Sequence, residues 1–137
     1  MENKLSKIIF DKIGVPNYQK YLDLSSVRHK LVSSNVANVA TPGYEAKDIK
    51  FEEEFKRATS QNEHLAGVTT DSRHIPLGQH KDRPPEILEQ RLAPDDLNSV
   101  DIDREMSNLA QNELRYTIAA RLLQRKFDGL RTAITSK

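Results

Sequence analysis

The sequence predicts a mainly α-helical protein in which two long terminal helices, about 17–40 and 100–134, pack as a coiled-coil-like pair. Two observations lead to this class. Apolar residues recur at helical spacing near both ends of the chain. Between them, residues 59–98 hold four of the six prolines and two of the five glycines, which interrupt regular structure. We expect this middle part to be irregular and partly extended, with room for a short β-hairpin, and the whole chain to form one structural domain.

The C-terminal helix has the strongest pattern. From Ile102 to Ile134, alternating steps of four and three residues meet an apolar residue every time except at Glu113. A heptad seam of this length is typical of a helix that packs lengthwise along other helices. We therefore expect the seam to pack between subunits, through Ile102, Met106, Leu109, Tyr116, Ala120, Leu123, Phe127, Leu130 and Ile134.

A second apolar row, formed by Leu114, Ile118 and Leu122, lies on a neighbouring face of the same helix. Two rows exceed what one intramolecular partner can bury, so the surplus should face neighbouring subunits and gain most of its burial on assembly. Asn98 and Ser99 precede the helix and are expected to cap its start.

The N-terminal helix is predicted to run from Asn17 to about residue 40. Asn17 follows Pro16 and is a candidate cap. Leu24 and Leu31 lie on one apolar row of this helix and are further expected subunit-packing residues.

A tight turn should end this helix at Thr41-Pro42-Gly43-Tyr44. Proline presets the second position of such a turn, and glycine takes a positive φ at the third, so a type II turn is favoured. Residues 41–99 then form the turn and the irregular middle segment. Within it, residues 52–57 are expected to form a short helical turn, and 68–70 and 87–88 are candidate paired strands.

Residues 1–14 are predicted to be a separate segment for docking or export. Apolar side chains recur there at helical spacing until the Gly14-Val15-Pro16-Asn17 break. An isolated helix this short is marginal in water, so the pattern fits either a frayed terminus or a segment that docks on another protein. The residues expected to dock are Leu5, Ile8, Ile9, Phe10 and Ile13.

Composition argues against several functions. The net charge of +1 gives no general case for nucleic acid or acidic lipid as a partner. Cysteine is absent, which excludes disulfides and thiolate metal sites. We expect neither a cleavable secretory signal nor direct lipid insertion, because no apolar run is long enough. No catalytic or phosphate-binding motif occurs, so we expect no enzyme activity, cofactor or metal.

Four stretches, in order, resemble one family. SNVANVATPGY, residues 34–44, is similar to the ANxxTPGY signature of flagellar axial proteins. Residues 46–51, 72–76 and 98–105 then resemble the corresponding segments of the FlgB family of proximal rod proteins. The signature residues are Asn35, Ala37, Asn38, Thr41, Pro42, Gly43 and Tyr44.

The resemblance implies a structural subunit of the flagellar basal-body rod in the periplasm, which transmits torque from motor to hook. It implies export by the flagellar type III apparatus without a cleaved signal peptide. The implied partners are copies of the chain, other rod proteins, a rod-base adaptor, and membrane-ring and export-gate proteins. Two alternatives remain from the residues alone: a soluble coiled-coil adaptor or export chaperone that binds one helical partner, and a small metal-dependent enzyme using His74 and His80.

Overall fold

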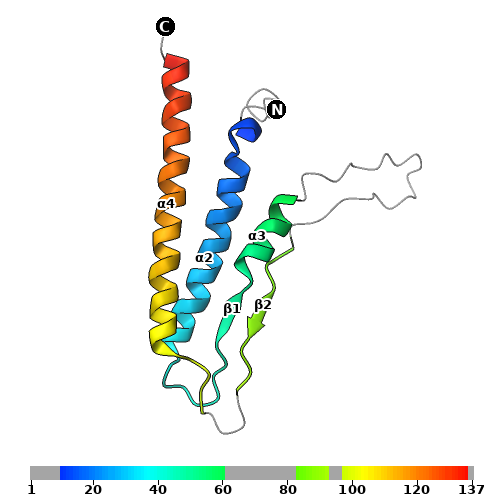
Figure 1. The fold of residues 1–137 in the computed structure, drawn as a ribbon, viewed down its shortest axis with the longest axis vertical. Helices are drawn as coiled ribbons and strands as arrows, with labels where there is room; N and C mark the ends of the chain where they lie inside the picture. Colours follow the sequence, from blue (N-terminus) through cyan, green and yellow to red (C-terminus); the bar gives the residue numbers. More distant parts are fainter. Residues whose placement is uncertain (1–9, 61–82, 93–96, 136–137) are drawn as a thin grey trace, which may run out of the picture.

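The computed structural model describes residues 10–60, 83–92 and 97–135 of the chain. Two long antiparallel helices lie side by side, and a shorter helix with two strands covers the other side of the first one (Figure 1). This arrangement confirms the predicted fold class. The elements are α2 (Val15–Ala37), β1 (Lys47–Ile49), α3 (Phe51–Ser60), β2 (Ile87–Glu89) and α4 (Ile102–Thr135).

Helix α2 begins two residues earlier than expected. Gly14 precedes it with a φ of 79°, and no side chain caps the first turn. Pro16 lies in that first turn, where a helix needs no backbone N–H and tolerates proline. The prediction that Asn17 caps the helix is therefore wrong. The predicted break is present, because residues 10–13 are helical and Gly14 separates them from α2.

The small apolar core lies between α2 and the segment formed by β1 and α3. Leu24, Ile49 and Phe51 are its buried members. The Tyr21 ring meets the Phe51 ring edge-on, with centroids 5.0 Å apart. Leu24 is only 8% exposed, so its own chain covers a side chain that was expected to face other subunits. Leu31 is half-buried against the same cluster.

The face that α4 turns toward α2 is not the predicted apolar seam. The buried residues of α4 are Glu105, Asn112 and Ala119, which recur every seventh position. The burial line is thus a heptad line rotated away from the seam, and two of its three residues are polar. Most large apolar side chains of α4 stay at the surface because polar side chains occupy the contact with α2.

The two strands pair antiparallel, with Lys47 opposite Glu89 and Ile49 opposite Ile87. The predicted strand at Ile87–Leu88 is therefore present, and its partner is β1. The other candidate strand, residues 68–70, lies outside the described residues. Helix α3 extends beyond the predicted turn at residues 52–57. Its first turn carries Glu52, Glu53 and Glu54, and the helix dipole stabilises negative charge at that end.

Candidate functional site

The signature residue Asn35 is the centre of a polar junction, which we define as Asn35, Tyr44, Lys47 and Glu105. Asn35 is 1% exposed. Its amide oxygen accepts hydrogen bonds from the Lys47 backbone N–H at 2.9 Å and the Tyr44 hydroxyl at 3.2 Å. Its amide nitrogen donates to the Lys47 carbonyl and to Glu105 Oε2, each at 2.8 Å. One side chain therefore joins α2, β1 and α4.

The signature turn has the predicted form. The Tyr44 N–H donates to the Thr41 carbonyl at 3.3 Å, and Gly43 adopts a φ of 75°. The Asn38 side chain links the end of α2 to this turn. Its amide donates to the Ser34 carbonyl at 2.8 Å, and its oxygen accepts from the Thr41 hydroxyl at 3.2 Å. The turn geometry and these hydrogen bonds explain Asn38, Thr41 and Gly43 of the signature. Ala37 and Pro42 are exposed beside them.

Asn98 and Ser99, which lie shortly before α4 in the chain, form hydrogen bonds to the signature turn and the residues beside it. The Asn98 amide donates to three carbonyls at the end of α2 and in the turn, at 2.8–3.0 Å. The Ser99 hydroxyl accepts from the Ala46 N–H at 2.7 Å. The prediction that these two residues cap α4 is wrong. Asp101 is the cap, and its Oδ1 accepts from the N–H groups of Asp103 and Arg104, each at 3.1 Å.

Two further polar contacts were not predicted, one buried and one partly buried. The Asn112 amide donates to the Ser25 carbonyl at 2.9 Å and joins the middle of α4 to α2. Arg28 on α2 forms a bidentate pair with Asp48 on β1, at 3.0 Å and 2.8 Å. The seven-residue spacing of Glu105, Asn112 and Ala119 could have predicted the contact made by Asn112. It was missed because a search for apolar periodicity does not count polar residues.

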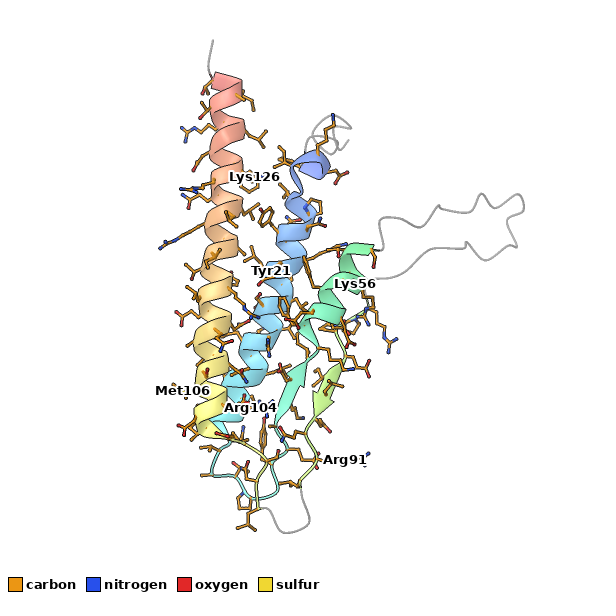
Figure 2. All side chains as sticks on the ribbon, in the orientation of Figure 1. Tyr21, Lys56, Arg91, Arg104, Met106 and Lys126 are labelled. Atoms are coloured by element: carbon orange, nitrogen blue, oxygen red, sulfur yellow. The ribbon has the colours of Figure 1, made fainter. Side chains whose placement is uncertain are left out.

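Helix α4 leaves two apolar faces at the surface, and its side chains project along its whole length (Figure 2). The seam face, with Ile102, Met106, Tyr116 and Phe127, has side chains that are 39–50% exposed. The second-row face, on another flank of the helix, consists of Leu114 at 62%, Ile118 at 50% and Leu122 at 42%. Beyond both, Ile134 is 81% exposed, while Leu109, Ala120, Leu123 and Leu130 are half-buried.

A hollow adjoins each face. On the second-row side, an apolar groove of about 480 Å³ lies between α2, α3 and α4 and is lined by Tyr18, Tyr21, Phe55, Ile118 and Leu122 among others. On the seam side, a polar notch of about 230 Å³ is lined by Ser25, Ser26, His29, Asn112, Glu113 and Tyr116. The two sides of α4 therefore differ in chemistry as well as in shape.

Part of the predicted docking segment is described. Phe10 is 40% exposed, and its ring meets the Phe127 ring edge-on with centroids 6.3 Å apart, which places Phe10 beside the C-terminal half of α4. Ile13 is half-buried. Leu5, Ile8 and Ile9 lie outside the described residues, as do His74 and His80.

Within the described ranges, no group of three or more acidic or histidine side chains is placed to hold a metal ion. No helix in the described part of the chain is sufficiently long and apolar to cross a membrane.

Comparison with known proteins gives a consistent set of relatives. A flagellar basal body rod protein FlgB of Cereibacter sphaeroides is 37% identical over 125 residues, which cover 90% of this chain and 94% of the relative. The FlgB of Escherichia coli strain K12 is 33% identical over 126 residues, covering 86% and 90%. The FlgB of Bacillus subtilis strain 168 is 28% identical, covering 88% and 92%. No protein-family model matches the chain.

Together with these relatives, the helix pair and its TPGY turn, which resembles the signature of flagellar axial proteins, define a helical subunit of the flagellar rod class. The chain belongs to the flagellar basal body rod protein FlgB family.

Proposed function

We propose that this chain is a structural subunit of the bacterial flagellar basal-body rod, as the names of its relatives indicate. The observation that supports the proposal is the exposure of two apolar faces on α4, whose large side chains are 39–62% exposed. Covering these faces releases water from apolar surface and favours association. The proposal requires no catalytic group.

The two faces are unlike, and this difference favours an open assembly. A closed twofold dimer pairs the same patch on both subunits, whereas unlike faces meet head to tail and build filaments or rings. The seam face of one copy meeting the second-row face of the next would leave one free face at each end. An adaptor or chaperone that binds one helical partner would need only one such face, so this alternative is less favoured.

The polar junction has a mechanical role in this proposal. It fixes the end of α2 to the first turn of α4 through the Asn35 contact with Glu105. A rod that transmits torque from motor to hook needs subunits whose two long helices cannot slide past each other. Hydrogen bonds buried at the closed end of the pair resist that sliding, because each would have to be broken without access to water.

Other parts of the proposal rest on the family resemblance. We propose that the copies assemble with other rod proteins in the periplasm, near a rod-base adaptor, the membrane ring and the export gate. Export would use the flagellar type III apparatus without a cleaved signal peptide. Leu5, Ile8, Ile9, Phe10 and Ile13 remain the proposed docking or export residues, and the contact between Phe10 and Phe127 would hold this segment near the end of the helix pair.

The test is Ile118→Asp, in cells that depend on this chain for swimming. Ile118 is 50% exposed, so a charge there should leave the fold intact while making burial against a neighbour unfavourable. We expect loss of swimming and of rods in isolated basal bodies, with helix content by circular dichroism unchanged. Gln19→Asp, at an exposed polar position on α2 and on neither apolar face of α4, is the control and should swim. Normal swimming of the Ile118→Asp cells would overturn the proposal.

A further inference from the structure

Charge is distributed unevenly along α4. Residues 101–118 carry four acidic side chains and two basic ones: Asp101, Asp103, Glu105 and Glu113 against Arg104 and Arg115. Residues 119–135 reverse this balance, with Arg121, Arg125, Lys126 and Arg131 against Asp128. Two parallel copies of α4 in equal register would place like charges together. An axial offset would place the basic half of one copy beside the acidic half of the next.

Glu113 is the residue of α4 whose surroundings depend most on the axial offset between two copies. It is exposed, it is the one charged residue in the apolar seam, and it pairs with no described cation. It lines the polar notch together with Ser25, whose hydroxyl is buried and has no hydrogen-bond partner among the described residues. A neighbouring subunit that covers the seam would remove water from the Glu113 carboxylate, so that neighbour must supply a cation.

Arg125 is placed to supply it. It continues the second-row face in helical steps after Leu114, Ile118 and Leu122, and it is exposed with no ion pair to a described residue. A guanidinium carries five N–H donors in a planar fork. It can therefore pair with the Glu113 carboxylate through two N–H donors at once.

We infer that the second-row face of one copy packs, parallel, on the seam face of a second copy, with Arg125 of one seated in the Glu113 notch of the other. The inference rests on the proposed function and specifies its contact. The offset is 12 residues, or about 18 Å along the helix. It places Leu114 beside Ile102, Ile118 beside Met106 and Leu122 near Leu109, so apolar side chains meet along the rest of the contact.

This contact also fixes axial register. Apolar rows alone tolerate sliding by a heptad, because each shift finds similar neighbours. A single buried polar position in an apolar seam penalises all registers but the one that satisfies it. Glu113 and Arg125 are such a position and its partner, and the same pairing can repeat from copy to copy in an open assembly.

The absence of cysteine makes a direct test possible. Glu113→Cys and Arg125→Cys chains are expressed together in cells that depend on this chain for swimming, and the cells are then treated with a mild oxidant. A disulfide needs Cα atoms within about 7 Å. We expect covalent dimers at least about tenfold above the level in cells with either variant alone. The control mixture, Glu113→Cys with Arg131→Cys, places the second thiol about 9 Å further along the helix and should stay near background.

Charge reversal provides the second measurement. Glu113→Arg and Arg125→Glu should each lower rod assembly and swimming, and the double variant should restore both, while Glu113→Arg with Arg131→Glu should not. Circular dichroism of each purified chain checks that the helices form. Dimers through position 131 in place of 125, or a double reversal no better than the single ones, would overturn the register. If the register is overturned but Ile118→Asp still blocks assembly in the same cells, the proposed function stands. If Ile118→Asp cells swim normally, the proposed function and the register both fail.

Discussion

The Asn35 amide donates a 2.8 Å hydrogen bond to the Glu105 carboxylate, across 70 residues of sequence. Both side chains are buried, with 1% and 8% exposure, at the end of the helix pair where the signature turn lies. A buried carboxylate is tolerated only when hydrogen bonds replace its hydration. The signature asparagine is thus explained by two demands: it completes the backbone pairing of Lys47 and it stabilises a carboxylate on the opposite helix.

Replacing this side chain should destabilise the fold. Asn35→Ala leaves the Lys47 backbone and the Glu105 carboxylate without their partner, and we expect a loss of about 3 kcal/mol in the free energy of unfolding. Urea denaturation of the purified chain, followed by circular dichroism, measures the change. Asn17→Ala, at an exposed position on the same helix, is the control and should change stability by less than about 0.5 kcal/mol. Equal effects of the two substitutions would contradict a special role for the junction.

Two glycines should respond in opposite directions to the same substitution. Gly43 has a φ of 75°, which an L side chain rarely adopts, so Gly43→Ala should destabilise by about 1–2 kcal/mol. Gly129 lies in α4, and an added Cβ there meets no atom within 4 Å, so Gly129→Ala should stabilise by about 1 kcal/mol. Thermal unfolding of both variants beside the parent chain gives the comparison. Destabilisation by Gly129→Ala would contradict the open space around this position.

The pKa of Lys47 should depend on its partner across the strands. The Lys47 amine lies 2.9 Å from the Glu89 carboxylate, and this hydrogen bond and charge raise its pKa above the ordinary 10.5. Because the folded pKa is raised, the stability from the pair is fully present below pH 10.5 and is lost as pH rises through the raised value. NMR titration of Lys47 should show the pKa falling toward 10.5 in Glu89→Gln.

Glu53→Gln is the control for this titration, because Glu53 pairs with Lys50 at 3.4 Å and not with Lys47. It should leave the pKa of Lys47 where it is in the parent chain. A pKa of Lys47 that does not change in Glu89→Gln would mean that the cross-strand pair is absent in solution.

Local rules account for what was predicted correctly. Helical periodicity placed both long helices to within a few residues, because apolar side chains at helical spacing are visible along the chain whichever face is finally buried. The signature turn was predicted from Pro42 and Gly43, since their backbone preferences hold in any context. The helix break at Gly14 was predicted for the same reason.

The sequence by itself thus determined the mainly helical class, the turn, and an excess of apolar surface on the C-terminal helix. Only the tertiary structure decided which line of α4 meets α2, that Leu24 belongs to a core with Ile49 and Phe51, and that β2 pairs with β1. It also turned Asn98 and Ser99 away from capping and toward the signature turn. The physical reason is that burial and hydrogen-bond partners are set by residues far apart in the chain, and a polar side chain such as Glu105 shows its need for a partner only once it is buried.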